Sequence, residues 1–147
     1  MVNEASQAKS SNIDKPKSIF KSFSSILFGY DFFNSFKLGP PPTGAQSYAS
    51  DMARRLRERD FSVFFSEEVA APGKKLDSVL IKALHRSRIL VVIANDGALL
   101  ESKWVPEEVV TFRKKHPKRP VVPINVDGAM QKNWSHAKVA EWFGYQW

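Results

Sequence analysis

The chain has 147 residues, of which 43% are hydrophobic and 25% charged, as is usual for one globular domain with or without a tail. No apolar run reaches the roughly 18 residues that a membrane-spanning helix needs. The sequence contains no cysteine, which excludes disulfide scaffolds, zinc–thiolate sites, iron–sulfur clusters and thiol nucleophiles. Twenty-two Lys and Arg against 15 Asp and Glu give a net charge of +7, so we expect the surface to attract anions.

The first 29 residues differ in composition from the rest of the chain. Residues 1–18 are rich in Ser, Lys and Asn and nearly free of large apolar side chains, which predicts a flexible tail. Residues 19–29 form an amphipathic lead-in segment, in which apolar side chains recur at helical spacing opposite lysines and serines. These apolar residues are Ile19, Phe20, Phe23, Ile26 and Leu27. Such a helix can lie on a membrane surface or dock a partner, but we favour the interpretation that it covers the core of its own domain.

Residues 30–147 alternate between strand-like and helix-like segments. Strands are predicted by short runs of apolar or aromatic residues at 31–36, 61–65, 89–94 and 121–126. Helices are predicted by amphipathic periodicity over about 45–56, 76–84, 102–115 and 136–142. Strands separated by helices predict right-handed crossovers and an α/β fold. We expect a flavodoxin-like three-layer sandwich, with a central parallel sheet of four or five strands and helices on both faces.

Local signals refine these segments. Thr43 or Ser47 is expected to cap the first helix. Pro123 predicts a bulge or a weakly paired position in the last strand. Residues 95–103 are expected to be a loop, and residues 143–147 are expected to begin a fifth strand.

Several common catalytic patterns are missing from the sequence. It has no GxGxxG or GxxxxGK[ST] phosphate loop and no GxSxG nucleophile motif, and its three histidines are too far apart for a local metal pair. Asp96 follows the third predicted strand, as in a phosphoacceptor receiver. Such a receiver also needs acidic residues at the end of the first strand, where this chain has Ser35, Phe36 and Lys37, so the pattern does not favour it.

One pair of residues is placed where ligands bind in such folds, at the carboxyl ends of the parallel strands. Trp104 and Glu108 are four residues apart and therefore share one stripe of the predicted helix at 102–115. Glu107 lies about 100° further round that helix and is expected to face elsewhere. Glu108 is thus predicted to border the carboxyl-end rim beside an aromatic ring, although a solvated glutamate on a helix remains the alternative.

Five stretches occur in an order that is specific for one fold. They are Asp31-Phe32-Phe33-Asn34-Ser35-Phe36, Phe61–Phe65 followed by Ala71-Pro72-Gly73, Ser87–Ile93, Ser102-x-Trp104-x-x-x-Glu108, and Val122-Pro123-Ile124. With this order the chain resembles a Toll/interleukin-1 receptor (TIR) domain, particularly the TIR domains of bacterial multidomain proteins. The predicted domain is residues 30–147. Because the chain ends where the fifth strand of the family would begin, we expect a fragment or an abbreviated form of a larger sensor protein.

The resemblance implies one of two activities. Many TIR domains cleave NAD+ at the nicotinamide–ribose bond, and the glutamate essential to them aligns with Glu108; NAD+ is then the substrate, and no cofactor is expected. Other members only associate with one another. The resemblance implies that Pro72 and Gly73, in the BB loop that follows the second strand, take part in assembly. It also implies that six residues bind NAD+: Ser35, Phe36, Lys37, Phe65, Ser66 and Trp104.

The chemistry of NAD+ cleavage agrees with a single carboxylate. Loss of nicotinamide leaves positive charge on the ribose, as in glycoside cleavage, and a fixed carboxylate stabilises that charge. Phe36 and Trp104 are suited to wall flat rings, and Lys37 is suited to meet a phosphate. Core packing is the alternative for Phe36 and Trp104. The loop 37–42 lacks the charged, Asp-containing pattern usual in the family.

The expected partners are NAD+, further copies of the same domain and the other domains of a larger sensor. The basic runs at 54–59 and 113–119 are interpreted as solvated faces or assembly surfaces, because no aromatic residues are interleaved with the basic ones. We therefore expect no specific nucleic acid and no membrane association. A cytoplasmic location and a role in signalling or anti-phage defence complete what the resemblance implies.

Overall fold

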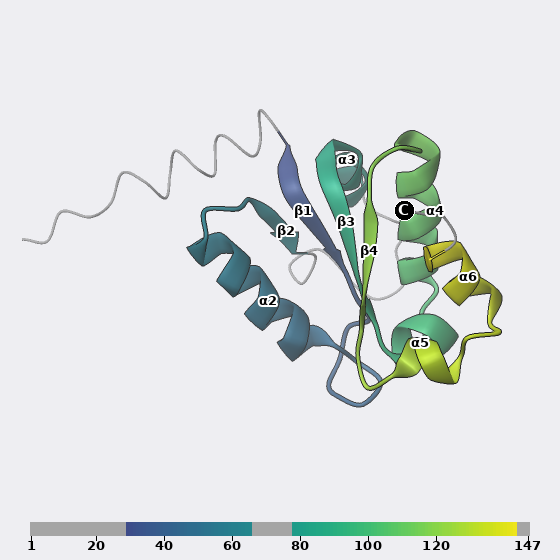
Figure 1. Ribbon diagram of the computed structural model, residues 1–147. Helices are drawn as coiled ribbons and strands as arrows, with labels where there is room; N and C mark the ends of the chain where they lie inside the picture. The colour runs from purple at the N-terminus through teal and green to yellow at the C-terminus, as the bar shows by residue number, and fades with distance from the viewer. Residues whose placement is uncertain (1–28, 66–77, 144–147) are drawn as a thin grey trace, which may run out of the picture.

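The computed structural model describes residues 29–65 and 78–143. The predictions for the tail, for the lead-in segment before Gly29, and for Ser66, Pro72 and Gly73 lie outside the described residues. Four parallel strands form one sheet with the order β2-β1-β3-β4 (Figure 1). Their bounds are β1 Tyr30–Ser35, β2 Val63–Phe65, β3 Ser87–Ala94 and β4 Val121–Asn125. The predicted α/β fold with a parallel sheet is confirmed.

Helices cover both faces of this sheet. The helical elements are α2 Gln46–Glu58, α3 Ser78–Arg86, the π-helical turn η2 Gly97–Glu101, α4 Trp104–Lys115, α5 Ala129–Lys132 and α6 Ala137–Phe143. Helix α2 lies on one side of the sheet, and α3, α4 and α6 lie on the other (Figure 1). No helix among the described residues is long and apolar enough to cross a membrane.

The larger of two hydrophobic clusters lies between the sheet and the α3–α4 layer. Side chains of β1, β3 and β4 alternate between the two faces, so Phe33, Leu90 and Val92 meet the buried stripes of these helices. Val105, Val109 and Phe112, the stripe predicted for α4, are fully buried. The smaller cluster, against α2, contains Phe36, Ala45, Ala49, Val91 and Ile93.

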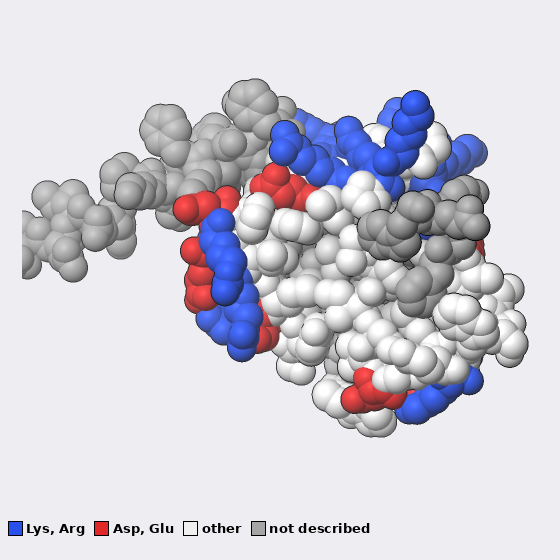
Figure 2. Space-filling model, in the orientation of Figure 1, with Lys and Arg blue, Asp and Glu red and all other residues white. Residues whose placement is uncertain are grey.

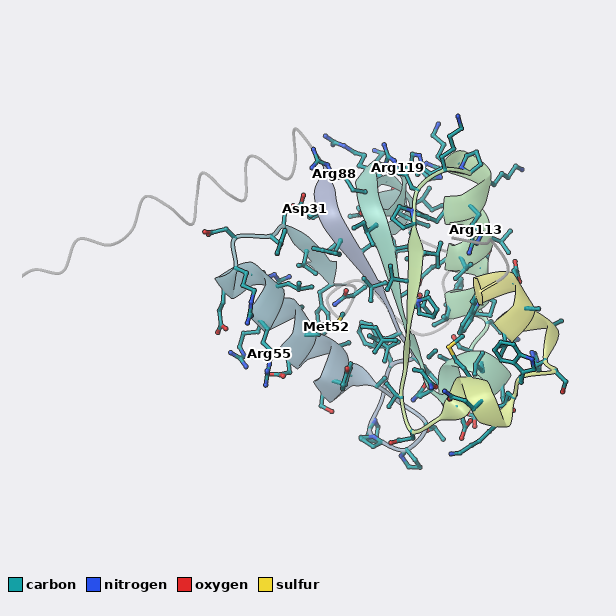
Figure 3. All side chains as sticks on the ribbon, viewed as in Figure 1. Asp31, Met52, Arg55, Arg88, Arg113 and Arg119 are labelled. Carbon is teal, nitrogen blue, oxygen red and sulfur yellow. The ribbon has the colours of Figure 1, made fainter. Side chains whose placement is uncertain are left out.

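Helix α2 explains the first basic run of the sequence. Met52 points toward the sheet, whereas Arg55 points away from it (Figure 3). Arg54 forms ion pairs with Asp51 and Glu58, and Arg55 forms one with Asp51. This run is therefore the outer face of an amphipathic helix, where pairs at i,i+3 and i,i+4 spacing help to keep the arginines paired at the surface.

The capping and second-strand predictions need correction. The N-cap of α2 is Ala45, with no side-chain hydrogen bond, so neither Thr43 nor Ser47 caps this helix. Strand β2 begins at Val63 instead of Phe61. The Ser62 amide and hydroxyl donate to the Asp31 carboxylate at 2.9 and 2.8 Å, so side-chain bonds tie this segment to β1 before the ladder starts.

Three predictions for the second half of the domain also differ from the structure. Residues 95–103, predicted as a loop, contain the turn η2, and the short helix α5 follows β4. Phe143, predicted to begin a fifth strand, belongs to helix α6, and residues 144–147 of that prediction lie outside the described residues. Pro123 causes no bulge, because it pairs with Val92 in an uninterrupted parallel register. The Leu90 amide donates to the Pro120 carbonyl, and the Val126 amide donates to the Ala94 carbonyl. Along β4 the backbone N–H and C=O groups of even-numbered residues therefore point toward β3. The backbone nitrogen of Pro123 faces the outer edge of the sheet.

Candidate functional site

The candidate site is centred on a buried carboxyl at the carboxyl end of β1. The Ser102 hydroxyl accepts a hydrogen bond from the Val105 amide at 3.2 Å where α4 begins. One turn into this helix, the side chain of Glu108 points inward with the core stripe, and only 5% of the residue is exposed. Its carboxyl accepts a hydrogen bond from the hydroxyl of Ser35, the fully buried last residue of β1. Two residues 73 positions apart therefore form one polar pair.

Burial controls the charge of this carboxyl. Loss of solvent raises the pKa of Glu108 from 4.5 to about 8, the Ser35 hydrogen bond opposes the rise, and the negative charge of Glu107 adds to it. The carboxyl is therefore mainly neutral at pH 7 without a ligand. A positive charge brought next to it favours the ionised form. A buried acid of this kind, at the strand ends of an α/β sheet, is a candidate for binding or catalysis.

Lys37 follows Ser35 by two residues, just beyond the end of β1. Its ammonium forms an ion pair with the Glu101 carboxylate of η2, and the side chains are 24% and 53% exposed. The predicted phosphate-binding residue thus has an acidic partner in this structure. An incoming phosphate would compete with Glu101 for the ammonium group.

The loop after β1 is held against the turn after β3 by residues that the sequence analysis missed. The side-chain NH2 group of Asn95 donates to the backbone carbonyls of Pro42 at 3.3 Å and Thr43 at 3.0 Å. The side-chain oxygen of Asn95 accepts a hydrogen bond from the backbone amide of Ala98 at 2.9 Å. Gly97 allows this approach, because a Cβ there would lie 1.8 Å from the Thr43 oxygen. An Asn directly after a buried strand, with Gly two residues on, was the available signal.

The aromatic candidates lie at separate positions. Phe36 and Phe65 stack with ring centroids 5.0 Å apart, in the cluster on the α2 side of the sheet. Because neighbouring residues of a strand face opposite sides, Phe36 does not share the face of Ser35. Trp104 is the first residue of α4, one turn before Glu108, and is 41% exposed. Within the described residues the structure therefore brings together Ser35 with Glu108, and Phe36 with Phe65.

Comparison with known proteins identifies the family. The sequence model of the TIR domain matches residues 43–146, so the chain belongs to the TIR domain family. This match includes Trp104 and Glu108 and begins after β1. The predicted resemblance to a TIR domain is confirmed, and the bacterial type stays a prediction.

A solved structure supports the same fold. The TIR domains of the activated Roq1 resistosome, which directly recognises the pathogen effector XopQ, have 24% sequence identity with this chain and a TM-score of 0.54. The match covers 79% of this chain and 69% of that chain. No protein of curated function matches the sequence significantly.

Proposed function

We propose that this TIR domain hydrolyses NAD+ at the nicotinamide–ribose bond, with Glu108 as the catalytic residue. The observation that carries the proposal is the buried carboxyl of Glu108, held by Ser35 at the carboxyl end of β1. It is supported by the Trp104-x-x-x-Glu108 spacing in a chain that belongs to the TIR family.

The charge state of the carboxyl suits a cationic substrate. The nicotinamide ring of NAD+ is positively charged, and a cation next to Glu108 favours release of the carboxyl proton. When the glycosidic C–N bond breaks, its electron pair leaves with nicotinamide, which departs neutral, and the ribose C1′ becomes positively charged. The Glu108 carboxylate stabilises this charge. Water then adds to C1′ and loses a proton, which gives ADP-ribose.

The neighbouring residues have distinct proposed roles. Ser35 donates to the carboxylate and fixes its direction. Trp104, which is exposed one turn before Glu108, is proposed to wall a flat ring of the substrate, and Lys37 is proposed to exchange Glu101 for a substrate phosphate. Ser66, Phe65 and Phe36 are proposed to contribute contacts at the edge of the site.

The test compares two adjacent glutamates. Concentrated full-length protein is incubated with NAD+, and nicotinamide release is followed by chromatography. Glu108→Gln is expected to lower the rate at least about 100-fold, because the amide cannot carry the stabilising charge. Glu107→Gln, at an exposed position of the same helix, is the control and is expected to keep the rate near that of the unmodified protein. Equal rates for the two variants would rule out the assignment.

Self-association in the cytoplasm, as part of signalling or defence, belongs to the same proposal. We expect the activity per molecule to rise with protein concentration, and a constant value on dilution contradicts this expectation.

The alternative proposal is a TIR interaction module without catalysis. It is favoured by the similarity to TIR domains within an assembled resistosome. In that case substitutions at Pro72 and Gly73 abolish association, measured by light scattering, while NAD+ remains intact at every protein concentration.

A further inference from the structure

Two polar contacts join the end of β1 to the segment formed by η2 and α4. Ser35, the last residue of β1, donates to Glu108 of α4. Lys37 forms an ion pair with Glu101, the last residue of η2. Only residues 102–103 separate η2 from α4, and two residues of chain span at most about 7 Å. The ion pair therefore belongs to the same rim of the sheet as the buried carboxyl.

The side chain of Lys37 is held in place along its length. Gly97 is the first residue of η2, and a Cβ there would lie 2.9 Å from the Cδ atom of Lys37. The aliphatic stem of Lys37 is therefore packed against this glycine, and only 24% of the side chain is exposed. The Lys37 carbonyl also accepts a hydrogen bond from the Ala45 amide at 2.9 Å. These contacts fix the position of the ammonium group independently of its anionic partner.

Glu101 is the more exposed member of the ion pair. Its side chain is 53% exposed, and among the described residues its carboxylate has no second ion pair. Exposed ion pairs contribute little to stability, because water screens the attraction and both side chains lose freedom. The Glu101 carboxylate is therefore able to leave the ammonium group with little effect on the fold.

The rim where the strands end carries charges of both signs. On the face that Figure 2 shows, blue side chains gather at the top, where the strands begin, and red and blue side chains lie together at the bottom. The second basic run of the sequence, residues 113–119, belongs to the top, because it leads from the end of α4 to the start of β4. An anion bound at the rim therefore depends on individual cations such as Lys37, and each carboxylate that pairs with them matters.

We infer that Glu101 is an internal competitor of the substrate, which occupies the ammonium group of Lys37 until a phosphate replaces it. The inference rests on the proposed function for the identity of the ligand, a dinucleotide with a pyrophosphate bridge. A carboxylate and a phosphate use the same N–H donors of a lysine. The negative charge of Glu101 also repels an approaching phosphate. Glu101 thus lowers the affinity of the site for phosphate-bearing ligands.

This role predicts an effect on binding and not on bond cleavage. The pyrophosphate takes no part in breaking the nicotinamide–ribose bond, so its contact with Lys37 is the same before and during the reaction. A contact of this kind changes KM and leaves kcat as it is. Glu101 therefore determines how much substrate the domain needs, whereas Glu108 determines the rate of cleavage.

The test measures the affinity for ADP-ribose, which has the same pyrophosphate and does not require catalysis. Binding to the full chain is followed by isothermal titration calorimetry. Glu101→Gln keeps the shape of the side chain, removes its charge and is expected to lower Kd at least about threefold. Glu107→Gln, the matched control, removes one negative charge at another exposed position and is expected to keep Kd near that of the unmodified protein.

A double-mutant cycle tests whether Glu101 acts through Lys37. Lys37→Met keeps the aliphatic stem against Gly97, removes the ammonium group and is expected to raise Kd at least about fivefold. Lys37→Met/Glu101→Gln is then expected to bind like Lys37→Met alone, because the competition has no object without the ammonium group. Circular dichroism checks that each variant folds.

The outcomes separate this inference from the proposed function. Tighter binding of ADP-ribose by Glu101→Gln supports the inference even if NAD+ stays intact. If NAD+ is cleaved, the same variant is expected to lower KM by a similar factor. The inference is overturned by an unchanged Kd for Glu101→Gln, by an equal gain for Glu107→Gln, or by the same gain in the Lys37→Met background. Absence of ADP-ribose binding in all variants overturns it as well.

Discussion

Replacing Glu108 by glutamine tests the buried carboxyl through the pH dependence of stability. In the unfolded chain this carboxyl has its ordinary pKa of 4.5, and in the folded protein burial raises the pKa to about 8. Between these pH values the folded protein holds a proton that the unfolded chain has released. The free energy of unfolding therefore falls as the pH rises from 4.5 to about 8, and this contribution is constant above pH 8.

The size of this effect follows from the two pKa values. Their difference corresponds to about 5 kcal/mol at 1.36 kcal/mol for each pH unit, a large fraction of the usual stability of a domain. Glutamine has nearly the same shape and does not ionise. Glu108→Gln is thus expected to gain about 4 kcal/mol relative to the unmodified protein between pH 5 and pH 9.

Urea unfolding, followed by tryptophan fluorescence at several pH values, measures this difference. The reduced pKa of His85, caused mainly by burial, gives a pH dependence of opposite sign, but it is the same in both proteins and cancels in the comparison. Glu107→Gln controls for the loss of one negative charge at the surface and is expected to follow the unmodified protein. Parallel stability curves for Glu108→Gln and the unmodified protein would refute the burial argument.

Three further substitutions test the packing around the site, each by urea unfolding at pH 7. Gly97→Ala is expected to destabilise the domain by about 3 kcal/mol, because its Cβ would overlap the Thr43 carbonyl oxygen; unchanged stability would show that the loop after β1 is not held there. Asn95→Ala loses the side-chain bonds to Pro42, Thr43 and the Ala98 amide and is expected to cost about 2 kcal/mol; a cost near zero contradicts the proposed clamp. Phe33→Ala empties a fully buried position and is expected to cost about 4 kcal/mol, and a loss below about 1 kcal/mol would be inconsistent with the core described above.

The sequence predicted the long, strongly patterned elements best. β3 is a continuous apolar run covered on both faces, and the structure adds only Ser87 and Arg88 to the predicted 89–94. Helix α4 begins two residues after its predicted start and ends where predicted. The turn η2 and the four-residue helix α5 were missed, because elements this short carry no measurable periodicity.

The residues of the candidate site were easier to predict from the sequence than their burial and their hydrogen bonds. The spacing of Trp104 and Glu108 placed both on one helical stripe, but their burial depends on what packs against each turn. Glu108 meets β1 and is buried, whereas Trp104 at the start of the helix is exposed. The partner of Glu108 came from the opening strand motif. The hydrogen bond from Ser35 to this carboxyl could not be predicted from the sequence, because it depends on the folded domain bringing residue 35 next to residue 108.

The position of Pro123 limits the ways in which copies of this domain would be able to pair along the edge of the sheet. β4 is the outermost strand on its side of the described sheet, and the proline nitrogen faces away from β3. A strand added along this edge would find no amide hydrogen at its centre and would lose one rung of the ladder. Contacts between side-chain surfaces are therefore favoured over continuation of the sheet from one molecule into the next.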